Sequence, residues 1–374
     1  MLLWAPLMKD SAIKPWEWFL FGLCRFIFSF LGGFMGKYWD IGKILSYQRN
    51  FNFINGERSI GKTYTTEKFF IDKAIKTGKE FVYITRTQDE KRNGIFKEAF
   101  SKVISREFPD KEIIFTNEEC ILKIDEYKRC LGYCIALSEA LKIKKRSFPN
   151  VYYLMFDEYM LENKGLTRYV NGWKEPELFL SLYHTIDREE DRVICFLLGN
   201  NTTFYNPYHM HPAFQIPHIK KGQIWAGENV LFQWAEGTEE LREEKANCKF
   251  LKMLNDTTYG KYAVKGDYIE DSDEFIEKRS AEARVSFNIE YMGNTYGIWN
   301  DMKHGRIYID TKTDPDCTLN YALTLEDHSE NTMLTSTKSI SCLNWLSQNF
   351  KLGNVRFVSM EVKKMCEGAI NLIL

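Results

Sequence analysis

Residues 56–63 read GERSIGKT, which matches the phosphate-binding pattern G-x-x-x-x-G-K-[ST]. An apolar run, FNFIN at 51–55, precedes this loop, and a stretch of helical spacing at 63–76 follows it. In a strand-loop-helix unit of this kind the loop N–H groups converge on phosphates at the positive end of the helix. We therefore expect a nucleotide to bind to Gly56, Glu57, Arg58, Ser59, Ile60, Gly61, Lys62 and Thr63.

The catalytic half of such a site is a carboxylate at the end of a neighbouring buried strand. The run VYYLMFDE at 151–158 ends in Asp157 and Glu158. We expect Thr63 and Asp157 to hold Mg²⁺, Lys62 to neutralise the β- and γ-phosphates, and Glu158 to polarise the attacking water. An acidic pair is also typical of a solvated strand end, but together with the loop it predicts an ATPase that uses ATP and Mg²⁺.

Strand-like runs alternate with helix-length stretches from residue 51 onward, which predicts an α/β fold. Apolar, β-branched or aromatic runs predict buried strands at 51–55, 80–86, 151–158 and 193–200. Amphipathic stretches predict helices at 63–76, 91–108 and 176–188, and an inserted hairpin is expected over 111–117 and 120–127.

The chain has 374 residues, which is long enough for two domains. Hydrophobic density falls over 237–268, which predicts a linker between a domain at 35–236 and a smaller α/β domain at 269–374. In the smaller domain, VSFNIEYMG, TYGIWND and GRIYIDTK are separated by turn residues and predict a three-stranded meander. Helices at 337–350 and from 361 onward are expected to flank a further strand, NVRFVSM.

The first 34 residues are hydrophobic and stay unassigned. The apolar run at 16–36 has the length of a membrane-spanning helix, but Arg25 lies at its middle and Glu17 near its start. An anchoring helix and a dispensable extension before a start at Met35 both fit. Nine cysteines without a CxxC pair indicate a reducing compartment, and a net charge of -1 does not by itself indicate a nucleic-acid partner.

Three further groups of polar residues are candidates for a function. Asn200 and Asn201 end a predicted strand, where an amide can sense the γ-phosphate, although turn-capping asparagines have the same pattern. Arg188 and Arg192 end a predicted helix, where an arginine can enter a neighbouring subunit's site or form surface ion pairs. A third group consists of histidines without the Cys or acid spacing of a metal site: His209, His211 and His218.

Several separate blocks, in order, resemble the encapsidation proteins of phi29-like phages, the ATPases that package double-stranded DNA into a procapsid. The resemblance covers 45–334 and is most specific in LSYQRNFNFINGERSIGKTY, FPNVYYLMFDEY, HTIDREEDRVICFLLGN with NPY at 206–208, FIEKRS, YGIWND and IYIDT. It implies a P-loop ATPase domain of the additional-strand, catalytic-glutamate type, followed by an RNase H-like domain. It also implies a homo-oligomeric ring, a pentamer, in the host cytoplasm at the portal vertex of the procapsid and absent from the virion after packaging. The partners that it implies are double-stranded DNA, the portal and a packaging RNA.

The same resemblance assigns residues to roles that the motifs do not reach. The family's trans-acting arginine falls on Arg188, and a lysine that acts across the subunit boundary falls on Lys144. A family lysine that grips DNA aligns with Gln88, so the corresponding contact here is expected from basic neighbours: Arg86, Lys91 or Arg92.

The RNase H-like domain is expected to bind without cutting. Two-metal cleavage needs carboxylates that converge on two ions about 4 Å apart. Asn288 stands where an aspartate is expected, and the acids Glu290, Asp301 and Asp310 lie on separate predicted strand faces. Two alternatives stay open: a large-terminase-like ATPase with an active C-terminal nuclease, and a membrane-anchored P-loop ATPase that needs residues 1–34.

Overall fold

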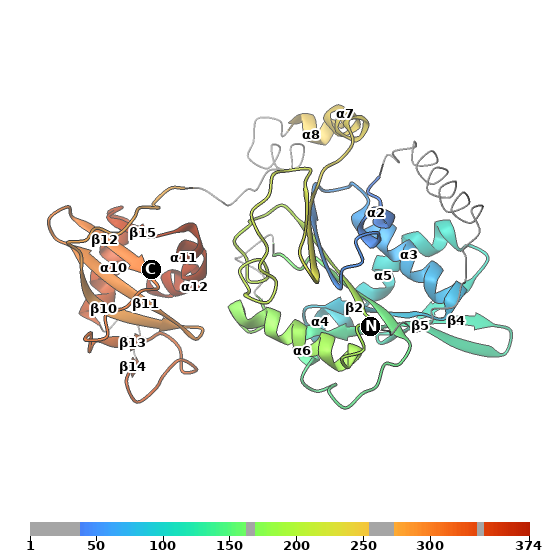
Figure 1. The fold of residues 1–374 in the computed structure, drawn as a ribbon, viewed down its shortest axis with the longest axis horizontal. Coiled ribbons are helices and arrows are strands. Elements are labelled where there is room, and N and C mark those ends of the chain that lie inside the picture. The colour runs from blue at the N-terminus through green and yellow to red at the C-terminus, as the bar shows by residue number, and fades with distance from the viewer. Residues whose placement is uncertain (1–37, 162–168, 254–272, 335–339) are drawn as a thin grey trace, which may run out of the picture.

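A nine-stranded sheet forms the larger part of the protein in the computed structural model, which describes residues 38–161, 169–253, 273–334 and 340–374 (Figure 1). Its strand order is β3-β4-β5-β2-β6-β7-β1-β9-β8. The central strands from β5 to β9 run parallel, and antiparallel pairs close both edges. The strands are β1 (Phe51–Gly56), β2 (Glu80–Thr85), β3 (Glu112–Phe115), β4 (Glu119–Ile124), β5 (Tyr127–Ala136), β6 (Val151–Asp157), β7 (Ile194–Asn200), β8 (Ile224–Ala226) and β9 (Val230–Ala235).

Both faces of this sheet are buried, because successive side chains of a strand point to opposite faces. Phe53 belongs to the core on the side of α6, and Ile54 belongs to the core on the side of α3 and α5. The helices of this part are α2 (Ile41–Leu45), α3 (Lys62–Thr77), α4 (Gln88–Arg92), α5 (Ile95–Glu107), α6 (Glu175–Asp187), α7 (Glu239–Asn247) and α8 (Lys249–Met253), with 3-10 turns η2 (Leu137–Glu139) and η3 (Gly172–Lys174).

The four predicted core strands and the inserted hairpin are confirmed, with small shifts at their ends. The single helix expected over 91–108 is wrong: it is two helices, α4 and α5, which separate at Gly94, where φ is +78°. Strands β5, β8 and β9 were not predicted. β5 begins with four exposed or half-buried residues, Tyr127 to Cys130, so its apolar pattern starts only at Leu131.

A six-stranded sheet, in the order β14-β13-β10-β11-β12-β15, forms the second part and has its own hydrophobic core. The predicted meander is confirmed as β10, β11 and β12, and its first turn has positive φ at Met292 and Gly293. Parallel strands extend the meander on both sides. The elements are β10 (Arg284–Tyr291), β11 (Asn294–Asp301), β12 (Arg306–Asp310), β13 (Asn320–Ala322), β14 (Met333–Leu334), β15 (Val355–Phe357), α10 (Ser341–Lys351), α11 (Met360–Met365) and α12 (Glu367–Ile373).

The expected linker at 237–268 is only partly described. Its first half forms α7 and α8, and residues 254–268 lie outside the described residues. The hydrophobic segment 1–34 also lies outside them. Within the described part of the chain, each helix is too short or too polar to cross a membrane.

Candidate active site

The predicted phosphate loop connects the end of β1 to the start of α3, and both of its outer glycines are structurally required. A Cβ at Gly56 would lie 2.7 Å from the carbonyl oxygen of Ala235, the last residue of β9. Gly61 precedes α3 with φ at +91°, a left-handed conformation that favours glycine. The loop can therefore turn tightly from β1 into the N-terminus of α3, the arrangement that binds phosphate.

The two expected magnesium ligands lie side by side. The Thr63 hydroxyl, in the first turn of α3, donates to Oδ2 of Asp157 at the end of β6, with a distance of 2.9 Å. The strand order β6-β7-β1 explains this contact, because parallel strands bring their carboxyl ends to the same edge of a sheet. A hydroxyl and a carboxylate are oxygen ligands of the kind that Mg²⁺ prefers, so the residues present fit the ion.

The charge of Asp157 also suits a cation. Burial, and to a lesser extent the neighbouring Glu158 carboxylate, raise the pKa of this carboxyl to about 6, although the Thr63 hydrogen bond and the Lys62 ammonium oppose the shift. At pH 7 most of the carboxyl is still ionised, because the pKa lies about one unit below the pH. A divalent ion would stabilise the ionised form further.

Glu158 follows Asp157 and is exposed, with an unusual backbone conformation at φ of +54°. It lines the same cavity of about 640 Å³ as the loop residues from Arg58 to Thr63 and as Asp157. The cavity therefore joins the phosphate loop, the expected metal ligands and the expected general base. That combination can bind a nucleoside triphosphate and activate water at its terminal phosphate.

Lys62 is the first residue of α3 and folds back over the loop. Its ammonium donates to the carbonyl oxygens of Gly56 at 3.0 Å and Glu57 at 2.9 Å, and its side chain is buried. A lysine held on the loop carbonyls in this way is close to the loop N–H groups on which phosphates would rest.

The two expected sensor residues have different positions. Asn200 ends β7 and lines the cavity, so it can report on a bound phosphate. Asn201 is fully buried and is not among the residues that line the cavity. The structure thus brings only Asn200 to the site.

Arg86 does not have the role in DNA contact that the sequence suggested. Its side chain is buried, and its guanidinium Nε donates to both carboxylate oxygens of Glu175, at 3.1 and 3.3 Å. Nη2 donates to the carbonyl oxygens of Glu158 at 3.2 Å and Tyr159 at 2.8 Å. Arg86 therefore holds the left-handed backbone of Glu158, the expected general base, and is unavailable to DNA.

Lys91 is likewise unavailable to DNA. It is buried, and its ammonium contacts Glu118 at 3.1 Å and Glu139 at 3.2 Å. Removing such an ammonium from two carboxylates would leave uncompensated charge. Of the three expected DNA contacts, Arg92 alone is exposed, with its nearest acid, Asp89, at 4.0 Å.

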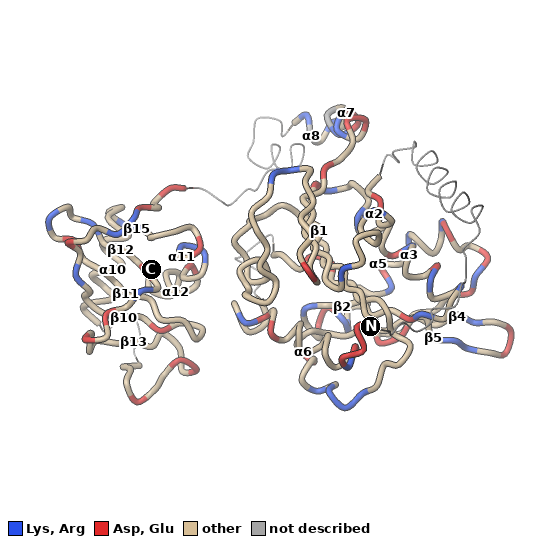
Figure 2. Tube along the Cα trace, in the orientation of Figure 1, with Lys and Arg blue, Asp and Glu red and all other residues tan. Residues whose placement is uncertain are grey.

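The expected trans-acting residues lie outside the chain's own cavity. Arg188 is exposed at the C-terminal end of α6 and donates to the carbonyl oxygen of Arg146 at 3.1 Å. That carbonyl belongs to an exposed basic loop, which includes Lys144 and is visible as a blue run below α6 in Figure 2. Arg192, by contrast, donates to the carbonyl oxygens of Phe148 and Ile186 and is held against the fold. The structure therefore distinguishes Arg188, which is exposed and contacts one loop carbonyl, from Arg192, which is held against the fold.

Six residues that the motifs do not mark also line the cavity: Tyr38, Tyr64, Thr65, Lys102, Arg106 and Gly199. Tyr38 packs against Gly61, and Lys102 and Arg106 of α5 reach the same cavity. No motif marks Tyr38, Lys102 or Arg106, because each comes from a segment whose place beside the loop is set by tertiary packing.

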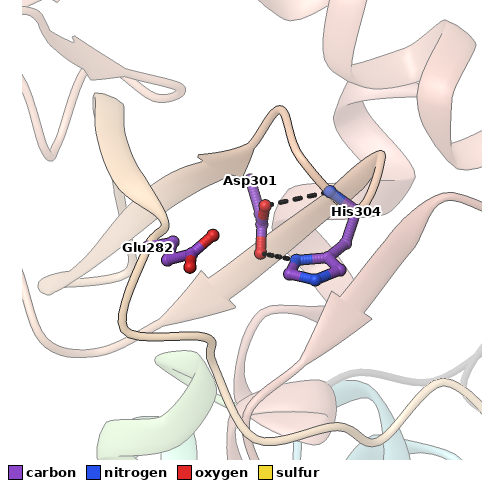
Figure 3. Close-up of side chains that lie close together, drawn as sticks. All are labelled: Glu282, Asp301 and His304. Atoms are coloured by element: carbon purple, nitrogen blue, oxygen red, sulfur yellow. Dashed lines mark hydrogen bonds and ion pairs between the residues drawn. The ribbon is translucent and has the colours of Figure 1, made fainter.

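The histidine group does not form a metal site. His209 is buried, its Nε2 lies 2.6 Å from the Tyr159 hydroxyl, and burial lowers its pKa to about 3. Among the described residues, the group with metal-ligand spacing is Glu282, Asp301 and His304 (Figure 3). There Asp301 accepts from His304 Nδ1 at 2.8 Å and from two backbone N–H groups, so it holds the turn between β11 and β12.

Two of the three acids expected in the second sheet, Asp301 and Asp310, are engaged by other side chains. Asn288 of β10 pairs in register with Asn320 of β13, and its side-chain amide donates to the Asn320 side chain at 2.8 Å. Asp310 forms an ion pair with Arg279 at 3.1 Å, and Asp301 is engaged in the turn. The neighbouring strands β10 and β13 thus present two neutral amides side by side, whereas two metal ions need converging carboxylates.

Comparison with known proteins agrees with this geometry. The family model for the Podovirus DNA encapsidation protein (Gp16) matches residues 35–370. The DNA packaging protein of Bacillus phage phi29 is 32% identical over 326 residues, which is 86% of this chain and 94% of that protein. The corresponding protein of Bacillus phage B103 is 30% identical, covering 84% of this chain and 94% of that protein.

Solved structures give the same result. A chain from the bacteriophage Phi-29 viral genome packaging motor assembly superposes with a TM-score of 0.65 and 30% identity, over 91% of this chain and all of that one. A chain from the Phi-28 DNA packaging motor has a TM-score of 0.55 at 20% identity, which shows the shared fold. The P-loop α/β fold class expected from the sequence is therefore confirmed. On the family match and the identity to the phage proteins, this chain belongs to the Podovirus DNA encapsidation protein family.

Proposed function

We propose that this protein hydrolyses ATP and uses the hydrolysis to move double-stranded DNA into a procapsid. The observation that carries the proposal is the 2.9 Å contact between the Thr63 hydroxyl and Asp157, in a cavity that Glu158 also lines. Membership of the encapsidation family supports DNA as the moved polymer.

The chain's own residues divide the chemistry between them. The loop N–H groups and Lys62 bind the phosphates, and Thr63 and Asp157 would hold Mg²⁺, which neutralises charge on the β- and γ-phosphate oxygens. Glu158 is exposed to the cavity and accepts a proton from the attacking water. Arg86 fixes the backbone of Glu158, and Asn200 reports on the γ-phosphate.

A ring of subunits supplies the remaining positive charge. Arg188 and Lys144 are exposed and lie away from the residues that line the chain's own cavity, so a neighbouring subunit is their natural target. We expect a homo-oligomer, a pentamer, at the portal vertex in the host cytoplasm, with DNA, the portal and a packaging RNA as partners. Arg92 remains the proposed DNA contact of the first part.

The domain that follows the ATPase binds its partner without cutting DNA. This part of the proposal rests on the neighbouring amides of Asn288 and Asn320 and on the ion pair that occupies Asp310. It separates the protein from a packaging ATPase that carries an active nuclease. The boundaries that we propose for the two domains are 35–236 and 269–374.

Two substitutions test the assignment of the ATPase site. Lys62→Ala should abolish ATP binding, because the phosphates lose their charged ligand. Glu158→Gln should bind ATP but not turn it over, because the amide cannot accept the proton. Binding is measured with a fluorescent ATP analogue and turnover by phosphate release, with Glu126→Gln, exposed and outside the cavity, as the charge-matched control. Turnover of the Glu158→Gln protein at the rate of the unsubstituted protein would refute the site.

The nuclease alternative has a separate test. The full-length protein is incubated with supercoiled plasmid in Mg²⁺ and in Mn²⁺, and nicking is followed on a gel. We expect intact plasmid in both metals. Linear or nicked products that are lost in an Asp310→Asn variant would instead show an active nuclease.

A further inference from the structure

The carboxylate of Glu57, the residue after the first glycine of the phosphate loop, is completely buried and is surrounded by three cations. Its Oε1 lies 3.3 Å from Lys221 Nζ and 3.3 Å from Arg242 Nη2, and its Oε2 lies 3.4 Å from Lys245 Nζ. A buried carboxylate needs such partners, because charge is poorly tolerated away from water. The loop motif leaves this position unspecified, so phosphate binding does not explain a glutamate here.

The three cations come from outside the loop. Lys221 precedes β8, whereas Arg242 and Lys245 both lie on α7, at positions three residues apart that share one helix face. Burial lowers the pKa of Arg242, but the contacts with Glu57 and Glu236 outweigh it, so the pKa is raised. Leu241 of the same helix is buried. Glu57 is therefore the buried charge that anchors α7, and Glu236, 3.0 Å from Arg242 Nη2, is a second acid that contacts the same arginine.

The side chain of Glu57 also packs closely against the segment that leads from β9 into α7. A Cβ at Gly237, which joins β9 to α7, would lie 3.0 Å from Oε2 of Glu57. The other end of the same residue contacts the catalytic lysine, since Lys62 Nζ donates to the Glu57 carbonyl oxygen at 2.9 Å. The backbone of Glu57 thus faces the nucleotide side of the loop, and its side chain faces α7.

α7 lies between the phosphate loop domain and the second sheet in the chain, so its contact with Glu57 can link the two. α7 and α8 are the last described elements of the first part, and β10 of the second sheet is the next named element in the chain (Figure 1). We propose that Glu57 is a positioning residue that couples the nucleotide state of the phosphate loop to α7, and through α7 to the second domain. When Lys62 moves from the loop carbonyls to a phosphate, the Glu57 carbonyl oxygen loses a hydrogen bond. The contacts between the Glu57 carboxylate and the two cations of α7 then change. This inference rests on the proposed ATPase function.

Hydrogen exchange of the full-length protein tests the coupling. Exchange of the α7 amides is measured with and without the ATP analogue AMPPNP and Mg²⁺. We expect the nucleotide to slow exchange across α7 by about tenfold in the unsubstituted protein, a size typical of local stability differences of this kind. In an Arg242→Gln/Lys245→Gln variant, AMPPNP should bind with unchanged affinity, and exchange across α7 should be fast in both states.

A charge-matched control removes two cations from the neighbouring helix. Lys249 and Lys252 of α8 are exposed, and the Lys249→Gln/Lys252→Gln protein should keep the nucleotide response of α7. Equal exchange across α7 with and without bound AMPPNP in the unsubstituted protein overturns the inference, and so does a full response in the α7 variant. Absence of AMPPNP binding would instead refute the proposed ATPase function, so the two failures are distinguishable.

Discussion

The hydroxyl of Thr63 and the carboxylate of Asp157 lie 2.9 Å apart, although 94 positions separate them in the chain. Thr63 lies in the first turn of α3, and Asp157 is the last residue of β6. Parallel pairing of β6 with β7 and of β7 with β1 is what brings them together. The contact therefore reports at once on the fold and on the expected metal site.

Loss of the Thr63 hydroxyl should weaken the metal site. In Thr63→Ala the expected Mg²⁺ ligand and the hydrogen bond to Asp157 both disappear, so the Mg²⁺ concentration for half-maximal ATPase should rise about 10–100-fold. Thr63→Ser keeps the hydroxyl and should stay close to the unsubstituted protein. A Mg²⁺ titration of phosphate release gives the answer, and identical curves for the alanine and serine proteins would contradict the assignment.

Glu67 should make the stability of the fold depend on pH. Burial, and then the charge of Asp157, raise the pKa of this α3 carboxyl from 4.5 to about 9. Between those two values the folded state binds more protons than the unfolded state, so the free energy of unfolding falls as the pH rises. In Glu67→Gln, which mimics the protonated form, this loss should vanish. We expect its free energy of unfolding at pH 8 to exceed that of the unsubstituted protein by about 1 kcal/mol or more.

Urea unfolding at pH 5 and pH 8 measures that effect. The difference between the two proteins should be smaller at pH 5 than at pH 8. Glu98→Gln, at an exposed position of α5, is a suitable control, since an exposed carboxyl should leave the pH profile unchanged. A Glu67→Gln protein that is less stable than the unsubstituted one at pH 8 would show that the carboxyl is ionised in the fold.

Arg86 should control turnover without contacting the nucleotide. It is not among the residues that line the cavity, but it holds the backbone of Glu158 and pairs with buried Glu175. Arg86→Ala leaves the Glu175 charge uncompensated and should lower the free energy of unfolding by about 3–5 kcal/mol. Arg86→Lys keeps the charge but not the forked geometry, so it should fold, bind ATP and lose turnover.

Two readouts separate these effects. Thermal unfolding reports on the loss of the buried pair, and single-turnover kinetics report on Glu158. If the Arg86→Lys protein turned over ATP at the unsubstituted rate, the backbone contact to Glu158 would be irrelevant to catalysis.

Arg188 and Arg192 should behave differently despite their closeness in the chain. Arg188→Ala removes an exposed side chain and should fold normally, while the ATPase of the assembled ring falls by about 10³–10⁵, as for an arginine supplied in trans. Arg192→Ala removes donors from several buried carbonyl groups and should destabilise the subunit before any effect on the ring.

Mixed rings give the decisive measurement for Arg188. Subunits that carry Arg188→Ala are combined with subunits that carry Lys62→Ala. The Arg188→Ala subunit keeps an intact nucleotide site, and the Lys62→Ala subunit keeps an intact Arg188. If the arginine acts across the subunit boundary, interfaces that join these two should regain hydrolysis. Equal loss of activity in isolated, unassembled Arg188→Ala subunits would place the arginine in its own subunit's site.

The parts of the site that sequence could predict are those with short, fixed spacing. The loop at 56–63 follows β1, and Asp157 and Glu158 lie at the end of β6. The carboxyl ends of parallel strands lie at the same edge of a sheet, so both can be placed from sequence. Arg86 could not be placed in this way, because its partner Glu175 is 89 positions away and no pattern links them. A basic residue that follows a strand has the same appearance in sequence whether it faces DNA or a buried acid.

The fold shows the same division. Strands with a continuous apolar run, such as β6 and β7, were predicted with small errors at their ends. β9 was missed, although it pairs with β1 directly beside the phosphate loop. Its partner lies about 180 residues earlier in the chain, and a parallel pairing over such a distance leaves no turn signal.

The close approach of Ala235 to Gly56 has a consequence for how such sequences change over evolutionary time. Any side chain at residue 56 would collide with the neighbouring strand, so the glycine is required for the sheet to close, whatever the loop binds. A related protein that no longer bound nucleotide would still be under selection to keep Gly56. Lys62 instead donates to the carbonyl oxygens of Gly56 and Glu57 in the loop itself, so its replacement would be the earlier sign that nucleotide binding has been lost.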